Sequence, residues 1–205
     1  MAPFILAAAL GYLAGSIPFA YLLVRWKTTL DIRREGSGNV GTLNSFVVSK
    51  SKWLAVAVLL LDLCKGAAAV LAVRLLIQAD FPHGATGGLA AVVGHSFPVW
   101  LGFKGGRGLA PAAGAFLVLN WLVVPFWLAL WGLSFLLLRA VNPANALASA
   151  LTLMAALLVP AEAWDWTLRE PVPASWLRGI VVLIMAVILV RHGEHVQELF
   201  RRGMS

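Results

Sequence analysis

Long stretches of apolar residues dominate this chain and constrain its fold more than any other feature. The first, residues 3–24, contains no charged side chain and is long enough to cross a hydrocarbon layer of about 30 Å. Six more follow at residues 53–77, 84–101, 109–122, 124–139, 143–160 and 174–191. Because 60% of the 205 residues are hydrophobic and only 12% are charged, a soluble domain is excluded. We predict an all-α integral membrane protein with about seven transmembrane helices, forming a single domain over residues 1–205.

The basic residues predict how the helices are oriented. With seven spans, twelve of them fall on the side that receives the end of the first span, namely Arg25, Lys27, Arg33, Arg34, Lys50, Lys52, Lys104, Arg107, Arg139, Arg191, Arg201 and Arg202. Only Arg74, Arg169 and Arg178 fall on the other side. Cytoplasmic loops carry the excess of lysine and arginine, so we predict an amino terminus outside and a cytoplasmic carboxyl terminus. The net charge of +7 then favours anionic lipid head groups over nucleic acid as a partner.

A glycine-rich segment, EGSGNVGTLNS at residues 35–45, has the G-x-G-x-x-G spacing of a dinucleotide-binding turn. A Rossmann turn requires a hydrophobic strand before the first glycine, whereas charged DIRRE precedes it here, and a Walker A loop requires a lysine where Thr42 stands. Glycines still allow backbone N–H groups to surround one anion. The segment is therefore either an anion site or an ordinary solvated loop, and its possible donors include Arg33, Ser37, Asn39 and Asn44.

A second glycine-rich segment favours the anion site. Lys104, Gly105, Gly106, Arg107 and Gly108 place two cations around a flexible turn, directly before an apolar helix that we expect to begin near residues 109–111. Basic residues beside a membrane are usually topology anchors, but anchors do not need three glycines among them. We predict a phosphate-sized concavity on the cytoplasmic side.

Two further groups of polar residues lie at or inside the membrane. Asp62 and Lys65 share one face of the second apolar stretch. The simplest interpretation is an ion pair between them, and a more specific alternative is a proton relay. His192 and His195 share one face where the last span ends, and they can share a ligand or a proton or belong to a frayed tail. The nearby arginines disfavour a divalent metal there.

These motifs together resemble the bacterial acyl-phosphate:glycerol-3-phosphate acyltransferases. The similarity runs from residues 12–18 (YLAGSIP) through GSGNVG, LDLCKG and GHSFPVWLGFKGGRG to Arg191 and His192. It implies a multi-pass enzyme of the bacterial inner membrane with its active site facing the cytoplasm. The implied reaction transfers a fatty acyl group from acyl phosphate to glycerol 3-phosphate, with no metal, no cofactor and no nucleic acid, and with the acyl tail lying among membrane lipids.

The resemblance also implies roles for individual residues. Lys104, His192 and Ser37 are implied to be catalytic. The residues implied to bind substrate are Arg33, Gly36, Gly38, Asn39, Gly41, Asn44, His95, Gly105, Gly106, Arg107, Gly108, Arg191 and His195.

Some positions depart from the family pattern. Leu43 and Val47 replace a usual threonine and arginine after the first glycine loop, and Gly193 and His195 replace a basic residue and an asparagine. The departures leave the acceptor open between glycerol 3-phosphate and another small molecule. They also motivate two alternatives: a non-catalytic binding or assembly subunit with a membrane partner protein, and a transporter for an anionic lipid.

Overall fold

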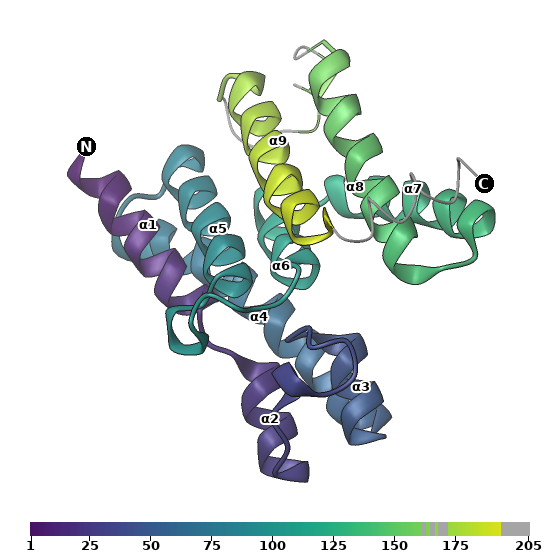
Figure 1. Cartoon of the computed structure of the whole chain (residues 1–205). Helices are drawn as coiled ribbons and strands as arrows, with labels where there is room; N and C mark the ends of the chain where they lie inside the picture. Colours follow the sequence, from purple (N-terminus) through teal and green to yellow (C-terminus); the bar gives the residue numbers. More distant parts are fainter. Residues whose placement is uncertain (161–162, 165–166, 168–171, 194–205) are drawn as a thin grey trace. The chain divides into compact units, whose positions relative to one another are not determined.

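The computed structural model describes residues 1–160, 163–164, 167 and 172–193, and all regular secondary structure in these residues is helical (Figure 1). This confirms the all-α prediction for the described residues. The chain divides into two compact units, Met1–Val118 and Leu119–Ser205. The first contains α1 (Ala2–Gly15), α2 (Phe19–Thr28), η1 (Ile32–Arg34), α3 (Thr42–Ser49), α4 (Lys52–Leu76), α5 (Phe81–Ser96) and η2 (Val99–Leu101). Helix α6 (Leu109–Leu119) ends at the boundary, and the second unit contains α7 (Val123–Leu138), α8 (Val141–Leu158) and α9 (Ala174–Arg191).

Four of the described stretches are long and apolar enough to cross a membrane: Ala2–Thr28, Lys52–Leu76, Val141–Leu158 and Ala174–Arg191. Helices α6 and α7 are apolar but shorter. The predicted boundaries of the last span, 174–191, agree with α9, and the predicted break near Asn120 separates α6 from α7. The full count of seven spans stays a prediction.

The first predicted span is not one continuous helix, which corrects the prediction for residues 3–24. Helix α1 ends at Gly15 and α2 begins at Phe19, with a short non-helical linker between them (Figure 1). The break follows from Pro18, which lacks an N–H group and disfavours helical backbone at the residue before it. The Ile17 carbonyl is thereby released from the helical pattern and accepts a hydrogen bond from the Lys65 side chain, with 2.8 Å between the two atoms.

Small residues hold α1 against α5. A Cβ atom added to Gly11 would overlap the backbone of Gly87, and one added to Gly15 would overlap the backbone of Ala91. Lipid tails are as apolar as leucine, so membrane helices associate by close backbone packing, and small residues permit it. The four positions therefore determine how closely α1 and α5 approach, and with them the place where the α1–α2 break lies.

A separate apolar cluster joins α2, η1 and the first glycine loop to the start of α4, and Figure 1 shows α2 and α3 gathered at that end of α4. Its buried members are Ala20, Val24, Ile32, Val40, Leu54, Val58 and Leu101. Val40 belongs to the first glycine loop and Leu101 to η2, directly before the second loop. Apolar burial therefore fixes the flanks of both loops.

Candidate functional site

The first glycine loop connects η1 to α3. Gly36 and Gly38 have φ angles of +57° and +69°, a backbone conformation that side chains disfavour. Gly38 donates its N–H to the Glu35 carbonyl at 3.0 Å, which closes a tight turn. The spacing of the glycines is thus explained by local backbone geometry, and α3 begins immediately after Gly41.

Asn44, on the first turn of α3, braces this loop from within. It is buried, and its Nδ2 donates to the carbonyls of Ile32, Glu35 and Asn39 at 3.1, 3.0 and 3.0 Å. Its Oδ1 accepts from the Ser37 N–H at 3.0 Å. The structure therefore gives Asn44 a bracing role, and direct contact with substrate stays a prediction for it. Ser37 itself is exposed at the outer side of the loop.

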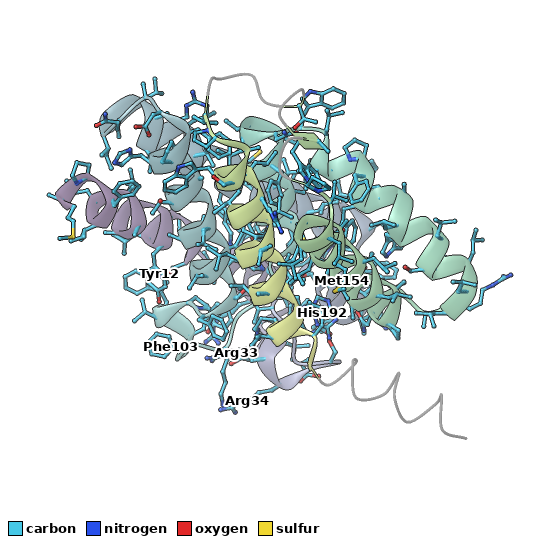
Figure 2. The ribbon with its side chains drawn as sticks, turned by 90° about the horizontal axis from the view of Figure 1, so that it is seen from above. Tyr12, Arg33, Arg34, Phe103, Met154 and His192 are labelled. Carbon is cyan, nitrogen blue, oxygen red and sulfur yellow. The ribbon has the colours of Figure 1, made fainter. Side chains whose placement is uncertain are left out.

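The two arginines before the loop differ in their surroundings. The Arg33 guanidinium forms a two-pronged ion pair with Asp31, whose closest atoms, Nη2 and Oδ2, are 2.6 Å apart. It also lies 5.2 Å from the centre of the Tyr21 ring. Hydrogen bonds from Arg33 lower the pKa of Asp31 to about 2, and the same pair raises the pKa of Arg33. Arg34 is exposed and projects away from the ribbon (Figure 2).

The second glycine loop folds back onto the end of α5. Gly105 donates its N–H to the Ser96 carbonyl at 3.2 Å, and Gly106 donates to the His95 carbonyl at 3.1 Å. Lys104 is exposed, whereas Gly105 and Gly106 are buried beneath it. Helix α6 begins at Leu109, directly after the loop, as the sequence predicted. The loop thus presents a lysine at the surface and the amino terminus of a helix behind it.

The two glycine loops meet at Gly106. A Cβ atom at this position would overlap the Nε2 atom of His95 and lie 2.7 Å from the carbonyl oxygen of Val40, in the first loop. Val40, His95 and Gly105 also line one small pocket, together with Asp62 and Lys65. The sequence predicted two anion-binding turns on the same face of the membrane, and the structure places Val40 of the first and Gly105 of the second around one pocket.

A buried ion pair forms the floor of this pocket. Lys65 Nζ lies 2.8 Å from Asp62 Oδ1, which confirms the predicted pairing of the two residues. His95 Nδ1 lies 3.5 Å from the same carboxylate oxygen, a contact that the sequence did not indicate. Asp62 and His95 are 33 positions apart on different helices, so only the packing of α4 on α5 brings them together.

His192 lies at the end of α9, in the second unit. Its Nδ1 is 2.8 Å from the Ile188 carbonyl oxygen. A carbonyl oxygen can only accept, so this contact requires a proton on Nδ1 and leaves Nε2 as the acceptor nitrogen of the neutral ring. Arg191 is the last residue of α9, and His195 lies outside the described residues. Among the described residues, no group of three or more His, Cys, Asp or Glu side chains is arranged to hold a metal ion.

The sequence matches a known protein family. A family model described as glycerol-3-phosphate acyltransferase matches residues 5–202. A protein named glycerol-3-phosphate acyltransferase from Myxococcus xanthus is 41% identical over 197 residues, which is 94% of each chain. One of the same name from Allorhizobium ampelinum is 38% identical over 199 residues, covering 96% of this chain and 87% of the relative.

Solved structures give the same comparison at the level of the fold. The crystal structure of PlsY, an integral membrane glycerol 3-phosphate acyltransferase, in its glycerol 3-phosphate form matches with a TM-score of 0.77 and 30% identity. The match covers 97% of this chain and 92% of that chain. The lysophosphatidic acid form matches with the same TM-score and 28% identity.

Proposed function

The chain belongs to the glycerol-3-phosphate acyltransferase family, and we infer that it is a membrane enzyme that moves a fatty acyl group from acyl phosphate to glycerol 3-phosphate. The relatives are acyltransferases by name over almost the whole chain, so the enzyme is favoured over a non-catalytic subunit or a transporter. The observation that carries the proposal at the site is the meeting of the two glycine loops at Gly106. Both substrates carry a phosphate, and two adjacent turns with cations suit two phosphorylated molecules.

The chemistry requires positioning more than bond activation by the protein. A hydroxyl oxygen of glycerol 3-phosphate attacks the carbonyl carbon of the acyl phosphate, the carbon–oxygen bond to phosphate breaks, and inorganic phosphate leaves. The donor is already an activated anhydride, so the reaction needs no covalent enzyme intermediate. The protein holds the two reactants together and stabilises the negative charge on the carbonyl oxygen and departing phosphate.

We assign the groups accordingly. Lys104, exposed on the second loop, stabilises the developing charge, and Arg107 binds phosphate. The Gly105 and Gly106 N–H groups donate to the Ser96 and His95 carbonyls, so these glycines shape the loop that carries the two cations. Ser37 and Asn39 hold the other phosphate. His192 takes the hydroxyl proton on Nε2. Its Nδ1 already carries a proton, because this nitrogen donates to the Ile188 carbonyl.

Arg191 and His195 stay predicted substrate-binding residues. The glycines Gly36, Gly38, Gly41, Gly105 and Gly108 shape the turns, and Asn44 and Arg33 brace the first loop from inside.

The protein is an integral membrane protein, and we propose its arrangement in the bilayer. Seven spans within a single domain over residues 1–205, with the amino terminus outside, put both glycine loops at the cytoplasmic face of a bacterial inner membrane. The proposal is supported by twelve basic residues on that side against three on the other.

The test is acyl transfer by the purified protein. Acyl phosphate and glycerol 3-phosphate are expected to yield lysophosphatidate and inorganic phosphate, and Lys104→Ala is expected to lower kcat by about 100- to 1,000-fold because one charge-stabilising donor is lost. Lys52→Ala, which removes an exposed lysine at the start of α4, is the matched control and should retain activity. No product from wild-type protein with glycerol 3-phosphate would overturn the proposal for this acceptor.

A panel of other phosphorylated and non-phosphorylated acceptors then tests whether Leu43 and Val47 have changed acceptor choice. Co-purification from membranes tests for a stable partner protein. Transfer to a panel member at a higher kcat/KM than to glycerol 3-phosphate would establish an altered acceptor.

A further inference from the structure

Three polar side chains are buried near the second glycine loop, and none of them has a role in the reaction proposed for this chain. Asp62, Lys65 and His95 are 2%, 6% and 8% exposed. Charged groups are costly within a membrane, and removing one partner of a buried ion pair is strongly destabilising. Asp62 and Lys65 line the small pocket beside Gly105 and Val40, and His95 lies between the Asp62 carboxylate and Gly106.

Lys65 makes two polar contacts within this buried group. Its Nζ lies 2.8 Å from Asp62 Oδ1 and donates to the Ile17 carbonyl at 2.8 Å. It therefore balances the carboxylate charge and satisfies a carbonyl at the break between α1 and α2. These contacts explain why a lysine is tolerated here, but they do not reach the glycine loop.

His95 provides the connection from Asp62 to the loop. Its Nδ1 faces Asp62 Oδ1 at 3.5 Å, while its Nε2 lies against Gly106, where a Cβ atom would overlap it. The His95 carbonyl accepts the Gly106 N–H at 3.1 Å. Gly106 thus lies against the ring of His95 and is hydrogen-bonded to its backbone.

We propose that Asp62 is a positioning residue for the Lys104–Gly108 loop and acts through His95. The carboxylate accepts from the Nδ1 side of the imidazole and fixes the plane of the ring, and the ring supports Gly106 so that the loop keeps its phosphate-binding shape. Lys65 keeps the carboxylate charge balanced. This inference rests on the proposed function, in which the loop binds the phosphate of a substrate.

Two replacements of His95 separate positioning from direct substrate contact. In His95→Asn, the amide nitrogen occupies a place near Nδ1 and still faces Asp62. In His95→Gln, the amide reaches the place of Nε2 and loses Asp62. If Asp62 acts through His95, the glutamine variant raises the KM for acyl phosphate about tenfold or more because a hydrogen bond to a charged group is lost. The asparagine variant raises it as well, because no ring atom then supports Gly106.

A glutamine variant near wild type beside an impaired asparagine variant would mean that His95 contacts substrate through Nε2 without Asp62, and it would overturn the proposal. An asparagine variant near wild type would show that the ring does not support Gly106, and it would overturn the proposal as well. Thermal unfolding in detergent is measured for both, so that the comparison is made between variants of matched stability.

The role of Asp62 itself is tested in a charge-neutral background. Asp62→Asn combined with Lys65→Met removes both charges together and leaves no unpaired ion. We expect this double variant to raise the KM for acyl phosphate as His95→Gln does, with a smaller change in kcat. Adding His95→Gln to it should cause little further loss, because both changes remove the same interaction. Losses that multiply in the combined variant would contradict coupling through His95.

Equilibrium binding of a non-hydrolysable acyl phosphate analogue gives a readout that does not depend on turnover. If wild-type protein forms no lysophosphatidate, the proposed function fails, while the dissociation constants of the His95 variants relative to wild type still test the positioning role. If wild-type protein is active and His95→Gln binds the analogue as tightly as wild type, only the present inference fails.

Discussion

Val47 stands on the face of α3 that borders the first glycine loop. A Cβ atom at Gly36 would lie 3.4 Å from Val47 Cγ1, so this position is in contact with the predicted substrate-binding turn. The family resemblance implies an arginine here, and Arg33, a basic residue just before the loop, is engaged by Asp31. The acceptor end of the site therefore has less positive charge than the resemblance implies.

Restoring that charge gives a testable result. We expect Val47→Arg to lower the KM for glycerol 3-phosphate by about ten- to a hundredfold, because a hydrogen bond between charged groups contributes about 1.5–3 kcal/mol. Val47→Gln has a long polar side chain without the charge and should have little effect. Steady-state kinetics with both substrates measure the change. A KM that does not respond to the arginine would place the acceptor phosphate away from this face of α3.

The Asp31–Arg33 pair gives the first loop a pH-dependent support. The pKa of Asp31 is lowered to about 2 in the folded protein, below its ordinary value of 3.8, so the folded state binds this proton more weakly than the unfolded state. The stabilisation is therefore complete well above pH 4 and is lost as the pH falls towards 2. The two side chains are 16% and 33% exposed, which limits the contribution to about 1 kcal/mol or less.

We expect Asp31→Asn to lower the melting temperature slightly at pH 7 and to converge with wild type as the pH is lowered below about 4. Thermal unfolding in detergent at a series of pH values measures the difference. A gap that stays constant, or widens on acidification, would show that the ion pair is not the source of the stabilisation.

Helix α2 buries one of its faces and exposes another. Val24 is fully buried in the cluster that includes Val40 of the first glycine loop, whereas Leu22 on the same helix is 50% exposed. Truncating a buried aliphatic side chain costs about 1–3 kcal/mol, and truncating an exposed one costs far less. The helix therefore offers a matched pair of substitutions, one inside the cluster and one outside.

We expect Val24→Ala to lower the melting temperature by several degrees and to raise the KM for at least one substrate, since the cavity loosens the support of Val40. Leu22→Ala should leave both near wild type. Unfolding and kinetics are measured in the same detergent. Equal effects from the two variants would contradict the idea that this cluster positions the loop.

The limits of prediction at this level have identifiable causes. Hydropathy located α4, α7 and α9 to within a residue or two. A long apolar run can be recognised from the sequence alone, because its signal does not depend on which helices pack against it. It missed the α1–α2 break, since Pro18 stands within an unbroken apolar run and does not change its mean hydropathy. The spacing of Asp62 and Lys65 was enough to predict their ion pair, as both lie on one helix.

The internal organisation of the site was not predictable in the same way. The contact between Asp62 and His95 depends on how α4 packs against α5. The bracing role of Asn44 depends on its burial, which a single polar residue in a glycine-rich segment does not reveal. Residue types and spacing therefore indicated which loops matter, and tertiary packing decided which side chains support them from beneath.

For the whole molecule, the distribution of charge predicts the direction in which α4 crosses the bilayer. Helix α4 has 25 residues and is about 37 Å long, enough to cross a hydrocarbon core. Lys50 precedes it on the side that we assign to the cytoplasm, and Gln78 follows it on the other. Both residues are exposed, and neither belongs to the proposed site, so each accepts a reporter group.

Cysteine labelling in intact cells tests the assignment. Cys64, the only cysteine, is first replaced by serine, and then Lys50→Cys or Gln78→Cys is introduced. A maleimide that cannot cross the inner membrane should label Gln78→Cys in spheroplasts and Lys50→Cys only after the membrane is opened, because the basic flank of α4 is retained inside. The opposite labelling pattern would put both glycine loops outside. It would also separate the proposed site from acyl phosphate and glycerol 3-phosphate, which as charged phosphates do not diffuse through a bilayer.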